Sequence, residues 1–300
     1  MRVLVTGAAG PRGKQIAAAI AADGHEVVGV DREAGEGVER VDYHKRGFEA
    51  LVRRGAFEGV VHLAVHAGFR LPPEERHRLN IEGTQRVVRL AVEHGVGRLV
   101  VASHATVYGA LADNPYFMTE DYPPRVGQMV PAMQDLVTAD LLATSAMWQH
   151  PGLSIVVLRP VHALGPTSRG VLASTLHRGW FPTILGYDPM VQVIHELDVA
   201  RAFALALSPP SGQALKGAFN VTGPGEVPLS VVLREAGVRG RAVPEIAFRL
   251  LRGRFGVPDA MAGAVDFLKH PCLVDGARFV EATGFQPEHG LRETLASMRH

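Results

Sequence analysis

Three glycines that follow a short apolar strand near the start of the chain constrain its fold more than any other feature. Val3–Val5 is an apolar run typical of a buried strand. Gly7, Gly10 and Gly13 come next, and the Ala/Ile-rich stretch Lys14–Ala22 predicts a helix. Glycine lets the backbone turn tightly and approach a phosphate, and a helix N-terminus offers unpaired N–H donors with a positive dipole. The strand, the turn and the helix together predict a cradle for a pyrophosphate.

The spacing of these glycines is G-x-x-G-x-x-G rather than G-x-G-x-x-G, so the turn alone also suits another kind of α/β protein. Asp31 favours a dinucleotide-binding protein over another kind of α/β protein, because it ends a second predicted strand, Glu26–Val30. Its distance from the glycines suits a carboxylate that accepts both hydroxyls of an adenosine ribose. The pair of signals predicts NAD as the cofactor and makes NADP the less favoured alternative.

The composition excludes several other classes of protein. The chain has 300 residues, 47% of them hydrophobic, with a formal net charge of +1 and one cysteine. No apolar stretch approaches the roughly 20 residues of a membrane span, and no basic cluster favours nucleic acid. A glycine turn that begins at Gly7 leaves no room for a signal peptide, and the lone Cys272 suits a reducing compartment. We therefore expect a cytoplasmic protein that binds neither membranes nor nucleic acid.

One close pair of histidines, His62 and His66, has a spacing that invites comparison with metal ligands. The first falls in a predicted strand and the second in the loop that follows, so the two share no helix face. We expect no metal site.

Strands and helices alternate through the first half of the chain, which predicts an α/β fold with a Rossmann-type doubly wound parallel sheet. The expected elements after the second strand are strands at 38–42, 60–63, 99–102 and 153–158, helices at 48–53, 73–94 and 130–148, and a loop at 109–127. Beyond Arg159-Pro160 the alternation breaks, apart from a helix at 197–207. We expect the Rossmann domain at residues 1–164 plus about 194–211, and a smaller C-terminal substrate-binding lobe at 165–193 and 212–300.

Short motifs then occur in the order and spacing of one known family. They are the glycine turn from Thr6 to Gly13, His62-Leu63-Ala64, Asn80-Ile81-Glu82-Gly83-Thr84, Ser103-His104-Ala105-Thr106-Val107-Tyr108-Gly109, Leu158-Arg159-Pro160, Gly165-Pro166, Ile194-His195-Glu196-Leu197-Asp198-Val199-Ala200 and Phe219-Asn220-Val221. On these residues the chain resembles the extended short-chain dehydrogenase/reductases, the NAD-dependent epimerase/dehydratase group that includes UDP-galactose 4-epimerase-like enzymes. The resemblance covers nearly the whole chain.

The resemblance implies a cofactor site that runs along the strand ends. It implies that Asp42 lies near the adenine, that Leu63 and Ala64 line the dinucleotide, and that Pro160 lies by the nicotinamide. The full set of expected cofactor-binding residues is Gly7, Gly10, Pro11, Arg12, Gly13, Asp31, Arg32, Asp42, Tyr43, Leu63, Ala64, Val65, Asn80, Ala102 and Pro160. Arg12 departs from the apolar residue usual in the glycine turn, and it either reaches a phosphate or points to solvent.

The catalytic pair of the family is missing from this chain. Family members carry a tyrosine and a lysine four residues apart on one helix face, where the positive charge lowers the tyrosine pKa. No Tyr-x-x-x-Lys occurs here, and the matching positions hold Ala132 and Leu136. The usual acid/base chemistry therefore needs other residues.

His104 is the favoured replacement, because it occupies the position of the family's Ser or Thr and an imidazole carries a proton near neutral pH. Ser103, or Tyr116 or Tyr122 from the loop, which we expect to be flexible, would assist it. The competing interpretation is a histidine that fills the space left by the missing tyrosine. In the family an asparagine in the long helix bends the helix or holds a water of the proton relay, so Asn80 either has such a role or is a structural polar residue.

The expected substrate residues, His66, His104 and His162, belong to a site that departs from the nucleotide-sugar pattern. Val191 replaces the arginine that clamps the diphosphate, and His162 replaces an asparagine. The second lobe is rich in large apolar residues that suit either an apolar substrate or an ordinary core, namely Trp180, Phe181, Met190, Phe248, Phe255 and Phe267. A small substrate without a nucleotide diphosphate is therefore expected.

Three functions compete on this basis. The favoured one is an NAD-dependent oxidoreductase or epimerase with a rewired site. The second is an inactive dinucleotide-binding sensor or regulator, and the third is a structural subunit beside a catalytic partner. By analogy with the family, the long helices at 73–94 and 130–148 predict a homodimer.

Overall fold

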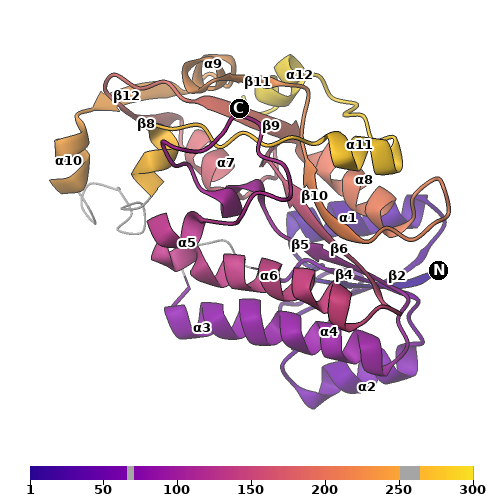
Figure 1. Cartoon of the computed structure of the whole chain (residues 1–300). Helices are drawn as coiled ribbons and strands as arrows, with labels where there is room; N and C mark the ends of the chain where they lie inside the picture. Colours follow the sequence, from indigo (N-terminus) through magenta and orange to yellow (C-terminus); the bar gives the residue numbers. More distant parts are fainter. Residues whose placement is uncertain (66–70, 251–263, 300) are drawn as a thin grey trace.

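The computed structural model describes residues 1–65, 71–250 and 264–299, and its centre is a parallel sheet of seven strands (Figure 1). Their order across the sheet is β3-β2-β1-β4-β5-β6-β10. The bounds are β1 Arg2–Thr6, β2 Glu26–Asp31, β3 Val38–Arg40, β4 Gly59–His62, β5 Arg98–Ala102, β6 Ser154–Pro160 and β10 Gly217–Val221. The order reverses between β1 and β4, and in such sheets a ligand binds outside the carboxyl ends of the strands at that point. The predicted Rossmann-type fold is confirmed.

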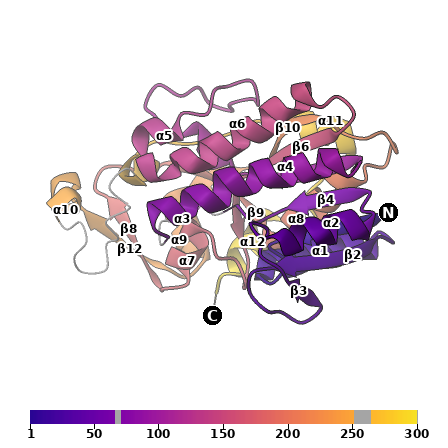
Figure 2. The same cartoon turned by 90° about the horizontal axis from the view of Figure 1, so that it is seen from below.

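Successive side chains of each strand point to opposite faces of the sheet. Helices cover both faces, so the strands are buried on both sides. Val3 and Val5 pack into one apolar cluster, whereas Leu4 between them packs into another. The first cluster lies under α1 (Pro11–Ala22), α8 (Glu196–Leu207) and α11 (Ala277–Thr283), and the second under α2 (Arg46–Gly55), α4 (Gly83–Glu93) and the C-terminal half of α6 (Gln134–Gln149). Figure 2 shows α4 and α6 lying side by side over their face of the sheet.

A smaller lobe has its own apolar core. It contains a three-stranded sheet in the order β11-β9-β7 and a parallel pair of β12 with β8. Its elements are β7 His162–Leu164, α7 Val171–Leu176, β8 Trp180–Ile184, β9 Met190–His195, β11 Glu226–Pro228, α9 Leu229–Glu235, β12 Arg239–Val243, α10 Glu245–Leu250 and α12 Leu291–Ala296. No helix in the described part of the chain is long and apolar enough to cross a bilayer.

The structure corrects the expected division of the chain in one place. β10 lies inside the range assigned to the smaller lobe, yet it pairs in parallel with β6 and forms an edge of the central sheet. The α11 residue Phe279 packs in the cluster that β10 shares with the large sheet. Residues 217–221 therefore belong to the Rossmann sheet, because pairing between distant strands, which local patterns do not report, decides their place.

Two predicted helices are interrupted by short irregular turns. The helix expected at 73–94 runs as α3 (Pro73–His77), a π-helical turn (Arg78–Glu82) and α4. The helix expected at 130–148 begins with α5 (Val126–Met129) and a 3₁₀ turn before α6. π-helical turns inside α-helices occur frequently at functional sites, and this one holds Asn80.

Candidate active site

The glycine turn has the backbone that a pyrophosphate cradle needs. Gly7 has a φ of +76°, a conformation that favours glycine, and a Cβ on Gly13 would lie 2.2 Å from the carbonyl oxygen of Gly7. The close approach of α1 to β1 therefore requires glycine at position 13. Gly10 is the N-cap of α1 and Pro11 its first residue, and no side chain caps this N-terminus. A Cβ on Gly10 would meet nothing within 4 Å, so space for a ligand lies beside these N–H donors.

Asp31 lies at the end of β2 and faces the same turn. Its Oδ2 accepts a hydrogen bond from the Ala9 N–H at 3.0 Å, and its Oδ1 accepts one from the Glu33 N–H at 3.2 Å. Each carboxylate oxygen accepts more than one hydrogen bond, so these contacts orient the group and leave acceptor capacity for ribose hydroxyls. Asp31 thus lies where the sequence predicts a carboxylate for an NAD ribose.

The neighbouring residues expected at the adenosine end have structural contacts of their own. Arg32 pairs with Glu75 at 3.2 Å, and Asp42 accepts from the His44 N–H at 2.9 Å. Tyr43 is buried, and its hydroxyl donates to the Ala64 carbonyl at 3.4 Å. Tyr43 therefore supports the segment that carries Ala64, and its ring is closed off from solvent.

The remaining expected cofactor residues gather at one edge of the sheet. Leu63, Ala64 and Val65 directly follow β4, Ala102 ends β5, and Pro160 ends β6. The carboxyl ends of parallel strands meet at the same edge, so these residues border the crevice that begins at the glycine turn. The described residues fit an extended dinucleotide.

A cavity of about 180 Å³ continues from this crevice toward the smaller lobe. Its polar lining residues are Arg12, Ser103, His104, Thr106, His162 and Thr175. Its apolar lining includes Met133 and Leu136 from the large domain and Leu172, Phe181, Val191, Leu229, Phe267 and Leu268 from the smaller lobe. Leu136 and Val191, which stand where the resemblance expects a lysine and an arginine, thus both face this space. Of the lobe residues singled out from the sequence, Phe181 and Phe267 line it, whereas Phe255 lies outside the described residues.

The hydrogen bonds of His104 define which ring nitrogen carries the proton. The backbone N–H of Thr106 donates to Nδ1 at 3.1 Å, and the Thr106 hydroxyl lies 2.9 Å from the same atom. Nδ1 is therefore an acceptor, and in the neutral ring the proton is on Nε2. His104 offers the cavity an N–H donor.

The environment keeps His104 and its neighbour His162 uncharged. The two ring centroids lie 5.2 Å apart. Burial, His162 and the positive charge of Arg12 hold the pKa of His104 well below its usual value, and burial lowers the pKa of His162 to about 4. Protonation would also place an N–H on Nδ1 that points at the Thr106 N–H. Two donors would then face each other, which disfavours the charged ring. The geometry therefore favours a neutral hydrogen-bond donor over the proton carrier near neutral pH that the sequence suggested.

Ser103 is tied to a buried ion pair that the sequence did not reveal. Its hydroxyl donates to Asp140 Oδ2 at 2.6 Å, and Asp140 forms a paired contact with Arg159, with Nη2 2.5 Å from Oδ1 and Nε 2.9 Å from Oδ2. The hydroxyl proton of Ser103 is thus engaged, and its oxygen remains an acceptor toward the cavity. The one available signal was an aspartate in the otherwise apolar middle of the helix, 19 residues before Arg159.

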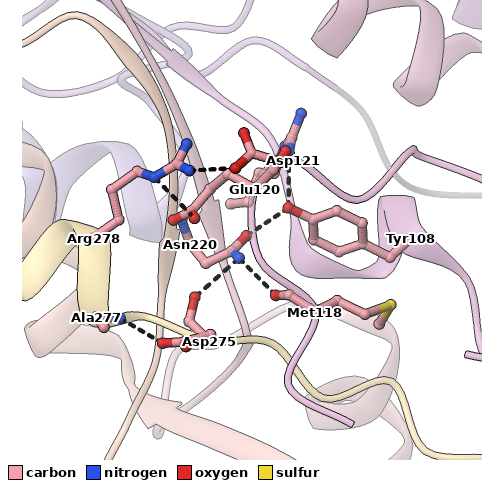
Figure 3. A network of polar contacts seen from close by, with 9 residues as sticks. Tyr108, Met118, Glu120, Asp121, Asn220, Asp275, Ala277 and Arg278 are labelled. Carbon is pink, nitrogen blue, oxygen red and sulfur yellow. Dashed lines mark hydrogen bonds and ion pairs between the residues drawn. The ribbon is translucent and has the colours of Figure 1, made fainter. Parts of the chain in front are cut away.

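The same network continues to the C-terminal segment (Figure 3). Arg159 donates to the Tyr108 hydroxyl at 2.7 Å, and that hydroxyl donates to Asn220 Oδ1 at 2.9 Å. Burial raises the pKa of Tyr108 to about 12, so it remains a donor. Asn220 Nδ2 donates in turn to the carbonyls of Met118 and Asp275. These bonds fix the loop at 109–127 against β10 and the segment before α11.

The fixed loop does not bring its tyrosines to the cavity. Tyr116 lies two residues before the anchored Met118, is 67% exposed and is absent from the cavity lining. The Tyr122 hydroxyl donates to Asn114 at 3.2 Å and accepts from Arg125 at 2.9 Å. The expectation of a catalytic Tyr116 is corrected here, because it requires a flexible loop and the buried network instead holds this loop in place.

Other expected site residues lie apart from the cavity. Asn80 is fully buried in the π-helical turn, outside the cavity lining. His66 lies outside the described residues. His62 is buried, with Nδ1 2.7 Å from the Thr6 hydroxyl and Nε2 3.3 Å from the Thr84 hydroxyl. Within the described ranges, no group of three or more His, Cys, Asp or Glu residues could hold a metal ion.

Comparison with known proteins identifies a family and agrees with the Rossmann-type fold. The model of the NAD dependent epimerase/dehydratase family matches residues 3–222. An uncharacterized protein of Mycobacterium tuberculosis is 26% identical over 255 residues, which span 83% of this chain and 67% of that protein. The UDP-glucose 4-epimerase of Bacillus subtilis is 23% identical over 347 residues, which span 99% and 95%.

Two solved structures share the whole architecture. MoeE5 in complex with UDP-glucuronic acid and NAD superposes with a TM-score of 0.78 at 26% identity, covering 99% of this chain and 97% of that one. The UDP-glucose 4-epimerase of Thermus thermophilus in complex with NAD gives a TM-score of 0.76 at 22% identity, with the same coverage. The second likeness, at its lower identity, supports the fold alone.

Proposed function

The chain belongs to the NAD-dependent epimerase/dehydratase family, and from that premise we propose that it is an NAD-dependent oxidoreductase acting on a small carbonyl or hydroxyl substrate. The glycine turn and the open N-terminus of α1 would hold the pyrophosphate, and Asp31 the adenosine ribose. Relatives crystallised with NAD, MoeE5 among them, support this cofactor.

The observation that carries the proposal is the cavity beside the strand ends. It presents the Nε2–H of His104 as an oriented donor, and its wall is apolar at positions 136 and 191. The smaller lobe contributes Val191 to this wall, at the position where the family's arginine makes a bidentate contact with a diphosphate. A cavity of about 180 Å³ suits a compact molecule. We therefore propose a substrate that carries no nucleotide diphosphate, unlike the UDP-sugar ligand in the MoeE5 complex.

The proposed chemistry uses few protein groups. NAD, when bound, supplies or accepts a hydride. His104 Nε2–H donates a hydrogen bond to the substrate oxygen and stabilises the negative charge that develops there when a carbonyl is reduced. A neutral imidazole is a recognised electrophile of this kind. Ser103 Oγ would accept from a substrate hydroxyl, and the proton that completes the alcohol would come from solvent water, with the hydroxide neutralised by bulk buffer.

A second function, an inactive dinucleotide sensor, is favoured by one specific observation. Leu136 faces the cavity at the position of the family's catalytic lysine, and no tyrosine among the described residues lines the cavity. A sensor would bind NADH through the same cradle and turn over nothing.

The test is to bind NADH, followed by its fluorescence, and then to offer compact ketones and 2-oxo acids while absorbance reports oxidation. We expect turnover that falls on the order of 10²-fold in His104→Ala, which is typical of the loss of one such donor. His104→Gln, whose amide also donates, should recover part of the loss. NADH binding without turnover of any compound would favour the sensor, and equal turnover in His104→Ala would remove His104 from the mechanism.

We also propose that the chain forms a homodimer through the outer faces of α4 and α6. Three large apolar side chains are exposed there, Val92 on α4 and Leu141 and Trp148 on α6. Leu141 and Trp148 are seven residues apart and so lie on one side of α6, and exposed apolar groups of this kind often mark a protein interface.

A further inference from the structure

We infer that the substrate is a small organic carboxylate, with its carboxylate held by Arg12 and an adjacent carbonyl or hydroxyl held by His104. That this carboxylate is reduced or oxidised rests on the proposed function. That it binds is argued from the residues that line the cavity. Its apolar body would lie against the wall formed by the smaller lobe.

The charges of the cavity point to an anion. Among the described residues, its lining contains one guanidinium, that of Arg12, and two neutral imidazoles, but no carboxylate. Arg12 is an exposed residue whose side chain also lines the cavity, and arginine binds carboxylates through two parallel hydrogen bonds. The cavity is therefore complementary to one negative charge.

Arg12 also lacks a competing partner in the described part of the chain. No hydrogen bond or ion pair within 4.0 Å joins its guanidinium to a described acid, and Glu196 acts on it only as a more distant charge. The contacts of the Glu196 carboxylate are with other groups, because it accepts from the hydroxyl of Ser168 at 2.7 Å and from that of Thr167 at 3.1 Å. The guanidinium is thus available to a ligand.

The remaining lining defines the body of the ligand. Leu172, Phe181, Leu229 and Phe267 give the cavity much of its apolar lining. An apolar protein cavity of about 150 Å³ holds benzene, so a cavity of about 180 Å³ suits a branched aliphatic or single-ring body. A 2-oxo acid with such a body places its carboxylate and its carbonyl one bond apart. Arg12 and His104, which face the same cavity, would bind the two groups together.

The rival role of Arg12 is contact with a cofactor phosphate, since its backbone belongs to the first turn of α1. The experiment separates the two roles by measuring cofactor and substrate affinity in the same variants. The probes are 4-methyl-2-oxopentanoate and 4-methylpentan-2-one, which differ by a carboxylate in place of a methyl group. Calorimetry measures their binding to the protein saturated with NAD⁺, a complex in which a ketone accepts no hydride.

We expect the oxo acid to bind on the order of 10- to 100-fold more tightly than the ketone, as one charge-assisted pair would give. Arg12→Met and Arg12→Gln should each abolish this preference. Lys14→Met is the matched control, because it removes a positive charge from the same helix at an exposed position outside the cavity lining. It should leave the preference unchanged.

Equal affinity for the two probes in the wild type would overturn the inference. So would an Arg12→Met variant that binds NAD⁺ more weakly and keeps the preference, since Arg12 would then serve the cofactor. Turnover with NADH is measured separately. Tight binding of the oxo acid without its reduction would therefore contradict the proposed reaction and still support the carboxylate site.

Discussion

Asp31 has contacts that the structure shows and one role that we propose, and both depend on its carboxylate. It holds the glycine turn through the Ala9 N–H, and its remaining acceptor capacity faces the predicted ribose site. His104 is likewise defined by one local bond, because the N–H of Thr106 selects its tautomer. At the scale of single residues, short-range hydrogen bonds therefore decide which atoms remain available to a ligand.

Asp31→Asn tests the cofactor preference. Loss of the charge should weaken NADH binding on the order of tenfold, since a hydrogen bond to a charged group becomes a neutral one. The affinity for NADPH should rise relative to the affinity for NADH, because the carboxylate that repels a 2′-phosphate is gone. Fluorescence titration of both cofactors measures the ratio. A wild-type protein that binds NADPH as tightly as NADH would contradict the assignment of Asp31.

His104 and His162 predict how stability depends on pH. Their pKa values are lowered in the folded protein, that of His162 to about 4, whereas the unfolded chain titrates near 6.5. Between these values the unfolded state binds more protons, so stability rises with pH. Their contribution should be complete above about pH 6.5 and should fall progressively toward pH 4.

Thermal melts from pH 8 to pH 4 measure this dependence, with His162→Gln as the comparison. Buffers of equal ionic strength keep screening constant. The variant should lose less of its melting temperature on acidification than the wild type does. An identical loss in both proteins would show that other groups control the acid limit.

At the scale of secondary-structure elements, the packing of α1 on β1 positions the proposed cofactor site. Gly13 permits contact between the helix and the turn, and Gly10 leaves the helix N-terminus open. The two glycines occur in one motif, yet their surroundings differ. Gly13 is required by close packing, whereas Gly10 borders open space. The buried contacts from Ser103 through Asp140 to Arg159 similarly join the end of β5 to α6 and β6.

Alanine at each glycine separates folding from binding. Gly13→Ala places a Cβ against the Gly7 carbonyl and should destabilise the protein by about 1–3 kcal/mol, a typical cost of overpacking. Gly10→Ala meets no protein atom and should keep the free energy of unfolding while weakening NADH binding, because its methyl group enters the space proposed for the phosphates. Denaturant titration and NADH fluorescence measure the two effects. A stable Gly13→Ala protein with normal NADH affinity would show that the packing of α1 on β1 does not require glycine at position 13.

At the scale of the whole molecule, the large domain and the smaller lobe each contribute a wall of the cavity. Phe181 and Val191 belong to the smaller lobe. Ala102 and His104 belong to the large domain, at the carboxyl end of β5 and just after it. The network through Asn220 and Asp275 connects the Rossmann sheet to the segment that leads into α11. The site therefore depends on the relative placement of both parts.

The proposed dimer is tested on the face formed by α4 and α6. Trp148 is 85% exposed, which is unusual for a tryptophan in a monomer. Light scattering after size exclusion should give about twice the chain mass of 32.2 kDa. Trp148→Glu should shift the protein to monomer and leave NADH affinity unchanged. A monomeric wild type would remove the proposal.

The residues that sequence reasoning located correctly act through local patterns. The alternation of strands and helices and the spacing of Gly7, Gly10 and Gly13 lie within short windows, so they predicted the parallel sheet and the glycine turn that leads into α1. Asp140 and Arg159 escaped notice because their pairing joins positions 19 residues apart on different elements. Tyr116 was misplaced for the same reason, since the bonds that fix its loop come from β10 and from the segment before α11.

The sequence by itself determined the fold class, the family resemblance and the loss of the Tyr/Lys pair, because each depends on residue identity and short spacing. Only the tertiary structure decided that Arg12 faces the cavity, that His104 is a neutral donor, and that β10 belongs to the large sheet. These facts depend on burial and on contacts between distant segments. Burial and long-range pairing arise when the whole chain packs, and no local pattern contains them.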